Sequence, residues 1–393
     1  MKLPLDGVLV VSLEQAVAAP FATRQLADLG ARVIKIERPD GGDFARAYDG
    51  TVHGLSSYFV WLNRSKESLT LDVKRTDGQA ILAQLVDRAD VFVQNVGPGA
   101  AERLGTSATV LRAARPRLVV CTISGYGASG PYAGRKAYDL LVQNEVGLVS
   151  VTGTDETPSR VGISVADIAA GMYGFSGILT ALLARKDTGA GAAVDVSLFD
   201  ALAEWMGAPA YYTAYSGAPP LRTGGAHATI APYEVFVTRD GTEICLAIQN
   251  HREWTRFCTD VIGRPDLSDD ARYRSNPERV RHREALHETI AAVVGRLDAA
   301  TLLARLQAAG IASARRNDVA AFLAHPQLAA RDRWRDVGSP SGPVRALLPP
   351  IEIDGREPAM GAIPALGQHT EAILQELGFD GERIARLRAE GTI

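Results

Sequence analysis

The sequence predicts an α/β protein with a parallel, doubly wound sheet and a second, smaller α+β domain. The first observation is that apolar runs of strand length alternate with helical patterns over roughly the first ninety residues. The second is a change of composition after about residue 205, where Gly, Pro, Ala and Tyr become frequent. Strands that alternate with helices pair in parallel, because each helix carries the chain back across the sheet.

The elements of the first half follow in order from their residue patterns. Buried apolar runs predict strands at 8–14 (VLVVSLE), 31–37 (ARVIKIE), 90–96 (DVFVQNV) and 117–124 (RLVVCTIS). Segment 20–30 (PFATRQLADLG) predicts a helix, because it has a proline at its start and a glycine at its end. Segment 77–89 predicts another, because its apolar residues recur at helical spacing.

The second half predicts a different organisation. Segment 206–233 is typical of a long functional loop or crossover. Segment 233–248 predicts a β-hairpin that turns at Asp240-Gly241. Charged helices are expected between about 270 and 325, including 280–297 and 299–310. In the tail we expect a strand-like segment and two short helices, at 346–354, 368–378 and 380–391.

Composition excludes several classes of function. The 393 residues carry a formal net charge of -3, which argues against general nucleic-acid binding. Three widely spaced cysteines form neither a disulfide framework nor a metal cluster, so we expect a reducing, cytoplasmic compartment. Asp6 interrupts the apolar N-terminus, so no signal peptide is expected. Segment 161–184 is long enough to span a membrane, but an internal Asp and four glycines favour a buried core helix.

A glycine pattern after the strand at 117–124 resembles a dinucleotide fingerprint. Gly125, Gly127 and Gly130 fit G-x-G-x-x-G, but Pro131 follows at once and the first plausible acids are misplaced. We therefore expect no nicotinamide or flavin. The histidines show no metal-ligand spacing, and Ser124 lacks the flanking glycines of a hydrolase nucleophile.

Cations gather at the ends of the predicted strands. Guanidinium and ammonium groups beside backbone N–H groups at helix starts suit phosphates, and α/β folds bind ligands at this edge of the sheet. Each charge taken alone is more readily explained as solvated surface, and their common placement is what indicates an anionic ligand. The residues are Lys35, Arg38, Arg64, Lys66, Lys74, Arg75 and Arg103.

One ionisable residue, Asp167, stands at the head of the apolar segment 161–184. An ionised carboxylate in apolar surroundings costs several kcal/mol unless donors or a cation compensate it. Asp is also a favoured helix N-cap. Asp167 is therefore either a cap or the best candidate nucleophile for covalent chemistry.

The whole chain resembles the class III CoA-transferases, a family that includes 2-methylacyl-CoA racemases. The similar segments run from about residue 7 to 390 in the expected order: LADLGARVIKIERP, NRSKESLTLDVK, QNVGPGAAERLG, SGYGASGPYAG, Asp167 with Gly171, LLARKDTGAGAAVDVSLFDA and LGQHTEAILQELG.

This resemblance implies two interlocked subunits, each an open ring. A large Rossmann-like domain takes both chain ends (1–205 and 326–393), a linker and active-site loop spans 206–228, and a small α+β domain spans 229–325. It also implies coenzyme A or acyl-CoA as substrate, with no tightly bound cofactor, metal, nucleic-acid or membrane partner. The matching CoA positions are Arg38, Leu71, Asp72, Val73, Lys74, Asn95, Val96, Gly97, Arg103, Lys136, Ala137 and Tyr138.

Asp167 matches the family's catalytic aspartate, which attacks the acyl-CoA thioester to give an acyl–aspartyl anhydride. Helix N-terminal N–H groups would keep this carboxylate ionised, so the cap and the nucleophile would be one residue. Racemases use the aspartate with a histidine, at the position of Tyr138 here, and a phenol with pKa of about 10 is a poor proton shuttle. The resemblance thus favours a transferase over a racemase. A CoA-binding protein without transferase activity is the third alternative.

Substrate-binding residues are expected in two loops. In the first loop Val17 stands where formyl-CoA transferase carries a glutamine, and Gln15 lies two places before it. This difference argues against specificity for formyl-CoA or oxalate. Formyl-CoA transferase carries a run of glycines in its mobile lid, whereas this chain has only Gly224 and Gly225 in that loop. Arg222 and His227 flank that pair and suit a second carboxylate on the substrate, and the alternative is an arginine in solvent and a histidine bonded to the backbone. We expect a short dicarboxylic acid, with succinyl-CoA as donor and itaconate, mesaconate or citramalate as acceptor.

Overall fold

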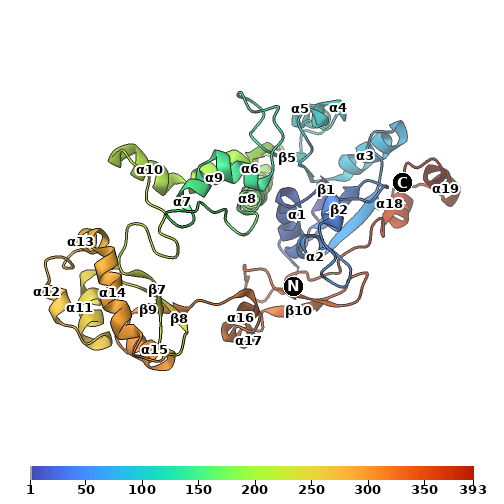
Figure 1. The fold of residues 1–393 in the computed structure, drawn as a ribbon. Coiled ribbons are helices and arrows are strands. Elements are labelled where there is room, and N and C mark those ends of the chain that lie inside the picture. Colours follow the sequence, from blue (N-terminus) through green and yellow to red (C-terminus); the bar gives the residue numbers. More distant parts are fainter. Residues whose placement is uncertain (1) are drawn as a thin grey trace. The chain divides into compact units, whose positions relative to one another are not determined.

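The computed structural model describes residues 2–393, and the chain divides into two compact units (Figure 1). The first unit comprises the chain up to Val146, Gly162–Met206 and Ala329–Ile393. The second comprises Gly147–Val161 and Gly207–Leu328. The boundary near 205 follows the change of composition, whereas segment 147–161 belongs to the second unit and not to the first, where the sequence prediction had placed it.

A six-stranded parallel sheet forms the centre of the first unit. Its strand order is β3-β2-β1-β4-β5-β6, which is a doubly wound arrangement, so the predicted α/β class is confirmed. The strands are β1 (Leu9–Leu13), β2 (Arg32–Glu37), β3 (Lys66–Thr70), β4 (Val91–Gln94), β5 (Val119–Ser124) and β6 (Ala193–Ser197).

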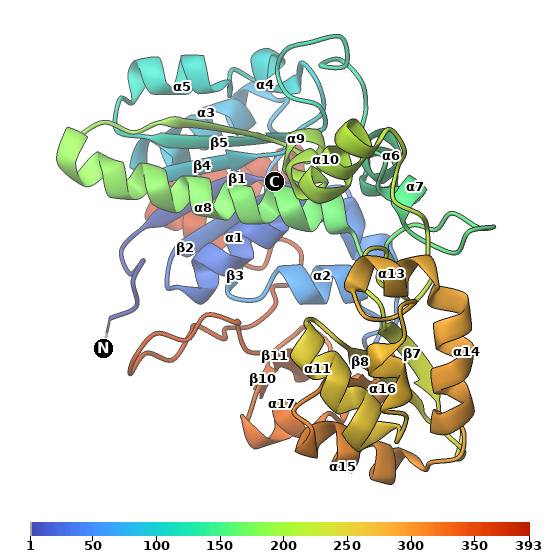
Figure 2. The same cartoon turned by 90° about the vertical axis from the view of Figure 1, so that its left-hand side faces the viewer.

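Helices cover both faces of this sheet (Figure 2). On one face α8 (Val165–Thr188) packs on α1 (Ala18–Asp28) and lies over β5 and β6. On the other face α3 (Thr76–Arg88), α5 (Ala108–Ala114), α18 (Thr370–Glu376) and α19 (Gly381–Ala389) share one apolar core with the strands. The remaining elements of this unit are η1 (Phe44–Ala47), α2 (Ser57–Leu62), α4 (Ala100–Arg103), α6 (Asp139–Glu145), α9 (Leu198–Trp205), β10 (Trp334–Val337) and β11 (Val344–Leu347).

Two strands of the sheet were not predicted. β3 contains Lys66, Glu67 and Ser68 and has no apolar run, because this edge strand carries buried side chains that form ion pairs and hydrogen bonds. β6 alternates exposed and half-buried residues at the sheet edge. The strand-like tail segment 346–354 is a strand only up to Leu347, since the consecutive prolines 349 and 350 lack the N–H that a ladder requires.

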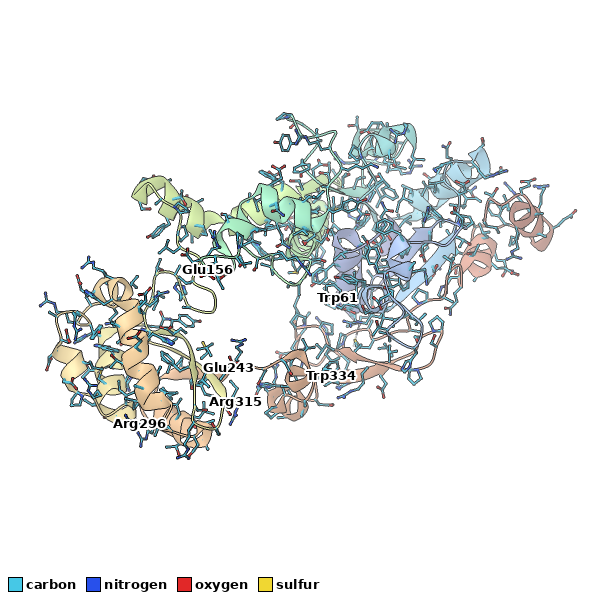
Figure 3. All side chains as sticks on the ribbon, viewed as in Figure 1. Trp61, Glu156, Glu243, Arg296, Arg315 and Trp334 are labelled. Atoms are coloured by element: carbon cyan, nitrogen blue, oxygen red, sulfur yellow. The ribbon has the colours of Figure 1, made fainter. Side chains whose placement is uncertain are left out.

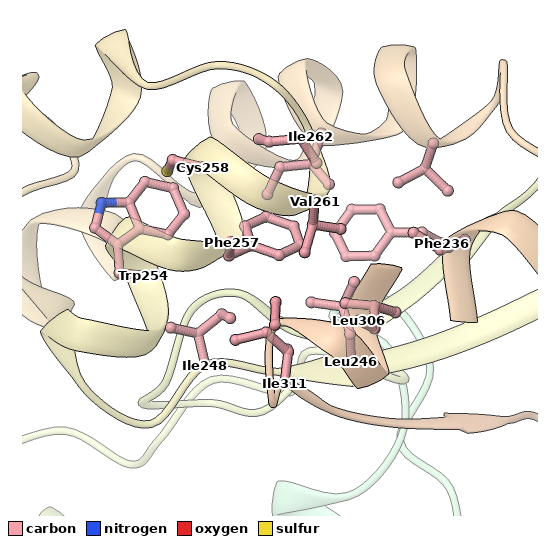
Figure 4. Packing of buried hydrophobic residues seen from close by; sticks show 14 of the residues in the cluster. Phe236, Leu246, Ile248, Trp254, Phe257, Cys258, Val261, Ile262, Leu306 and Ile311 are labelled. Carbon is pink, nitrogen blue, oxygen red and sulfur yellow. The ribbon is translucent and has the colours of Figure 1, made fainter. Parts of the chain in front are cut away.

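The second unit is an antiparallel three-stranded sheet covered by helices. The predicted hairpin is confirmed as β7 (Tyr233–Val237) and β8 (Glu243–Ala247), with β9 (Ala312–Arg315) paired to β8. Figure 4 shows the core of this unit, where Phe236 of β7 lies among Phe257, Val261 and Leu306. The helical elements here are α7 (Leu148–Val151), α10 (Gly207–Ser216), α11 (His251–Arg256), the π-helical turn η2 (Phe257–Val261), α12 (Asp266–Asp269), α13 (Asn276–Arg281), α14 (Arg283–Val294), α15 (Ala299–Ala308) and α16 (Val319–Leu323), while α17 (Pro326–Ala330) crosses the boundary between the units.

Segment 206–233 is not one long loop. Its first part forms helix α10, because alanine and tyrosine at 208–215 are compatible with a helix. Gly217 follows with φ of +79°, a left-handed conformation that ends helices readily. The irregular part is therefore confined to the residues between Gly217 and β7.

Helix α8 is long and apolar enough to span a membrane by length and composition. More than half of its most apolar window is buried inside the chain. Its glycines permit this packing: a Cβ at Gly171 would lie 2.7 Å from the Ala18 carbonyl oxygen, and one at Gly177 would lie 2.7 Å from the Val194 side chain. The expected core helix is thus present against α1 and the sheet.

Candidate active site

A pocket of about 350 Å³ lies at the carboxyl ends of the parallel strands in the first unit. Ligands of doubly wound sheets bind at this edge, so its position agrees with the prediction for an anionic ligand. It brings together several residues that the sequence selected: Gln15, Arg38, Leu71, Asp72, Val73, Lys74, Val96 and Gly97.

The loop after β1 is clamped from two sides. The Asn95 side chain accepts the Gln15 backbone N–H at 2.9 Å and donates to the Gln15 carbonyl at 2.8 Å. Asp43 accepts the Ala16 N–H at 3.0 Å, where Ala16 has the strained φ of +62°. Both polar atoms of the Asn95 side chain thus bind the backbone of this loop, so Asn95 contributes to the pocket by fixing the position of Gln15.

Beneath this loop lies a fully buried group of charges. Lys35 Nζ lies 2.7 Å from Asp43, and Lys66 Nζ lies 2.7 Å from Glu14. Burial lowers the pKa of Lys66 to about 8, although Glu14 opposes the shift. The expectation that Lys35 and Lys66 face an anionic ligand is wrong, because their ammonium groups are consumed by these carboxylates. Arg64 is likewise paired with Asp28, at 2.7 Å.

Other predicted CoA contacts lie outside the pocket lining. Arg103 is exposed on α4, and Lys136 and Tyr138 are exposed on the loop between β5 and α6. Ala137 packs so closely on Gly125 that a Cβ there would lie 2.3 Å from its own Cβ. This loop consists of turns until α6 begins, so the glycine pattern at 125–130 opens no helix and is not a dinucleotide fingerprint.

Asp167 is half-buried in the first turn of α8. It is not the cap of this helix: Ser164 occupies the N-cap, and the side chain that accepts the free N–H groups is Asp139, at 2.7 Å from the Ala166 nitrogen. Among residues 2–393, no hydrogen bond to the Asp167 carboxylate is formed. Burial and, to a smaller extent, the charge of Asp139 raise the pKa of Asp167 to about 7. The expectation that helix N–H groups keep it ionised is therefore wrong.

A series of aromatic rings includes one phenol close to this carboxylate. Tyr48 and Tyr58 meet edge to face at 5.5 Å between centroids, Tyr58 meets Trp61 at 6.4 Å, and Trp61 meets Phe21 at 5.6 Å. Figure 3 labels Trp61 on α2. Burial and the charges of Asp43 and Asp167 raise the pKa of Tyr48 to about 12, so this phenol lies within the field of Asp167.

The remaining predicted substrate residues belong to the second unit. Arg222 donates to the carbonyl oxygens of Thr154, Ser150 and Asp155 at 2.8, 3.1 and 2.6 Å. The Gly224 N–H donates to the Gly153 carbonyl at 2.8 Å, and Gly225 is exposed beside it. These bonds fasten the glycine pair to segment 147–161.

His227 has a different environment. Its ring stacks on Tyr233 with centroids 5.3 Å apart, and its Nδ1 accepts the Thr229 N–H at 3.2 Å. The side chain is exposed. Its second ring nitrogen makes no hydrogen bond within the part of the chain that the structure describes, so it can contact a ligand.

Two residues of the site escaped sequence reasoning. Asp43 follows two glycines and gave no signal beyond its charge. Asp139 directly follows Tyr138, and an Asp at the start of an amphipathic run is a helix-start signal that could have drawn notice. Its partner at residues 166–167 is distant in sequence, so only the fold identifies the contact.

A doubly wound sheet with a pocket at its carboxyl edge, together with a half-buried carboxylate in the first turn of α8, is the arrangement of an α/β enzyme. Residues 5–370 match the model of CoA-transferase family III, and the chain belongs to that family. It is accordingly a CoA-transferase by class, as the resemblance predicted.

Three similar proteins illustrate this membership. An acetyl-CoA:oxalate CoA-transferase of Acetobacter aceti is 38% identical over 87% of this chain and 89% of its own. A succinate–glutarate CoA-transferase of Agrobacterium fabrum is 34% identical over 96% of both chains. The crystal structure of a CAIB/BAIF family protein from Brucella suis has a TM-score of 0.83 and 34% identity, covering 96% of this chain and all of that one.

Proposed function

We propose that this CoA-transferase moves coenzyme A from succinyl-CoA to a short dicarboxylic acid through covalent intermediates on Asp167. The observation that carries the proposal is the Asp167 carboxylate itself, half-buried, close to the Tyr48 phenol and without a hydrogen-bond donor among the described residues. A carboxylate in this setting is a stronger nucleophile than a solvated one, because it is more basic and has little hydration to lose.

The reaction splits one difficult exchange into four acyl transfers. The Asp167 carboxylate attacks the thioester carbonyl and CoA thiolate leaves, which forms an acyl–aspartyl anhydride. The thiolate then attacks the aspartyl carbonyl, the donor acid leaves as a carboxylate, and an aspartyl–CoA thioester remains. The acceptor carboxylate attacks this thioester and releases thiolate again. The thiolate finally attacks the acceptor's acyl carbonyl, which yields acceptor-CoA and regenerates Asp167.

The pKa of about 7 sets the pH range of this chemistry. Above that value Asp167 is ionised and can attack, whereas below it the carboxyl is protonated and inactive. Neither water nor an external base takes part in the four transfers, so exclusion of water costs no step and protects the anhydride from hydrolysis.

The substrate class is inferred from chemistry and relatives together. The two curated relatives carry the names of glutarate and oxalate, which are both dicarboxylic acids. In this chain His227 offers an exposed ring nitrogen beside the glycine pair, suited to a second carboxylate. We therefore retain succinyl-CoA as donor and a short dicarboxylate as acceptor. Oxalate is included among the acceptors as a comparison. Because Val17 replaces the glutamine of formyl-CoA transferase, we expect oxalate to be a poorer acceptor.

A racemase is the second candidate, because the same aspartate can exchange an α-proton when paired with a second acid–base group. Tyr138 holds the position of the racemase histidine, and its side chain is 62% exposed. A phenol in water gives up its proton with difficulty near neutral pH. This arrangement favours the transferase.

The test is covalent labelling followed by peptide mapping. Wild type is mixed with succinyl-CoA, acetyl-CoA or a 2-methyl-branched acyl-CoA, and Asp167→Asn and Asp167→Ala serve as controls. We expect an acyl or CoA adduct on the Asp167 peptide, largest with succinyl-CoA, and none on either variant. Turnover with glutarate, mesaconate, citramalate and oxalate then ranks the acceptors. Deuterium uptake at the α-carbon without any adduct would establish the racemase instead.

A further inference from the structure

The first turn of α8 is capped by a side chain from another helix. Oδ1 of Asp139, the first residue of α6, accepts the Ala166 N–H at 2.7 Å and the Asp167 N–H at 3.4 Å. Ser164, at the N-cap position, makes no such bond. A helix has about four free N–H groups at its start, and here two of them are directed to Asp139 and away from the side chain of Asp167.

Asp139 is itself held firmly. Its Oδ2 accepts from Nε2 of the buried Gln143 at 2.7 Å, one turn further along α6. On the other side, Ala137 packs on Gly125 with no room for a side chain there. The carboxylate is thus fixed by three hydrogen bonds and by the chain that precedes it. Its placement beside Asp167 is a built feature of the first unit.

Resting on the proposed role of Asp167 as nucleophile, we propose that Asp139 is its positioning residue. It fixes the first turn of α8 by accepting two backbone N–H groups, which withholds these donors from the Asp167 carboxylate, and it places a negative charge near that carboxylate. Asp139 does not touch the reacting atoms. It acts through Asp167, by holding its backbone and by destabilising its ionised form.

The charges around Asp167 agree with this role. Burial is the larger cause of its raised pKa, and Asp139 is the charged side chain that adds to it. Tyr48 also faces Asp167, and its own pKa is raised to about 12, so that phenol stays protonated across the working range. Tyr58 and Tyr138 face Tyr48 in turn. Within residues 2–393 no cation acts on Asp167 to cancel the repulsion.

Two substitutions separate holding from charge. Asp139→Asn keeps an oxygen that can accept the Ala166 N–H but removes the negative charge, whereas Asp139→Ala removes both. The rate at which succinyl-CoA labels Asp167 in a single turnover is measured from pH 5.5 to 8.5. Asp187→Asn is the matched control, since it removes a charge at the exposed far end of the same helix.

We expect wild type and Asp187→Asn to lose labelling as the pH falls through about 7. For Asp139→Asn the pKa of Asp167 lies lower, so its labelling rate at pH 6, relative to its own plateau, exceeds that of wild type by about two- to threefold. Its plateau is also lower, because Asp167 is less basic. Asp139→Ala loses further plateau rate through the freed first turn of α8.

Each alternative result has a definite meaning. An unchanged midpoint in Asp139→Asn, with Asp167 still labelled, overturns this inference and leaves the proposed function intact. No labelling of wild-type Asp167 at any pH overturns the proposed function itself. If Asp139→Asn folds but does not label, Asp139→Glu decides: recovery of labelling with the acid supports positioning by a carboxylate, and failure to recover contradicts it.

Discussion

Arg222 commits its guanidinium to backbone oxygens, and this changes how the residue is interpreted. Its three hydrogen bonds to the carbonyls of Thr154, Ser150 and Asp155 fasten the loop that carries Gly224 and Gly225. A guanidinium has five N–H donors in fixed directions, and three separate acceptors already determine its orientation. Within residues 2–393 the second ring nitrogen of His227 makes no hydrogen bond, so our proposal assigns a distal carboxylate to His227 and not to Arg222.

The two residues predict different kinetic signatures. Arg222→Ala frees the glycine loop, so with succinyl-CoA as donor we expect kcat to fall by a similar factor with glutarate and with acetate as acceptor. If His227 binds the distal carboxylate, as we propose, His227→Ala removes that hydrogen bond, and we expect KM for glutarate to rise about 10-fold while KM for acetate is unaffected. Steady-state kinetics of both variants with both acceptors provide the measurement. If Arg222→Ala impaired turnover of glutarate alone, Arg222 would be the carboxylate ligand and the loop-fastening role would be wrong.

At the scale of single residues, the sequence singled out Asp167 but not the residues that surround it. Asp167 stands out because it interrupts an apolar segment, which any reader of the chain can see. Its partner Asp139 lies 28 positions earlier and meets it only after two helices pack. The prediction that Lys35 and Lys66 face a phosphate failed for the same reason, namely that the partners are distant in the chain. The carboxylates that neutralise these two ammonium groups come from other strands and loops.

Among the elements, α8 depends most on close approach. Gly171 lies one helical turn after Asp167 and faces α1 where a side chain has no space. Gly171→Ala would bring a Cβ to 2.7 Å from the Ala18 carbonyl oxygen and to 3.0 Å from the Phe21 ring. A backbone oxygen cannot rotate away as a flexible side chain can, so the helices must separate.

We therefore expect Gly171→Ala to destabilise the fold by about 1–2 kcal/mol, because overpacking outweighs the better helix propensity of alanine. Labelling of Asp167 should slow as well, since the first turn of α8 moves with the helix. Gly381→Ala is the control: this glycine begins α19, and an added Cβ meets nothing within 4 Å. Urea unfolding and single-turnover labelling test both effects. Equal stability of the two variants would contradict tight α1–α8 packing.

Helices and strands were predicted correctly where they bury apolar residues at regular spacing. The apolar strands β1, β2, β4 and β5 and the amphipathic helices α3, α14 and α15 were all predicted, since apolar spacing alone defines their buried faces. β3 was missed because it buries Lys66 and Ser68 instead of apolar residues. α10 was missed because its ten residues contain no buried face to produce a periodic pattern.

At the level of the whole molecule, the chain order of the two units explains what composition could and could not reveal. The change near residue 205 marks the start of the longer part of the second unit. Segment 147–161 joins that unit through contacts such as those of Arg222, which leave no mark on local composition. The return of the chain to the first unit for its last residues was expected from family resemblance alone, since nothing in the local pattern requires it.

The family resemblance predicts that two subunits assemble into an interlocked homodimer. In the first unit, large apolar side chains are exposed on α6, on α9 and just before α8. They include Leu141 of α6 at 49%, Trp205 of α9 at 47% and Ile163, which precedes α8, at 58%. Apolar surface of this kind on neighbouring helices is typical of an interface. We expect light scattering after size-exclusion chromatography to give twice the 41.8 kDa of one chain.

Interlocked subunits differ from an ordinary dimer in how they dissociate and exchange. Two interlocked rings cannot separate by simple diffusion, so the mass should stay constant on dilution to nanomolar concentration, and subunits of differently tagged preparations should exchange only after unfolding. A side-by-side dimer would exchange at a rate set by its dissociation. Mixing two tagged preparations and following mixed dimers by native mass spectrometry distinguishes the two. Exchange within minutes under native conditions would exclude linked rings, and a mass of one chain would exclude the dimer altogether.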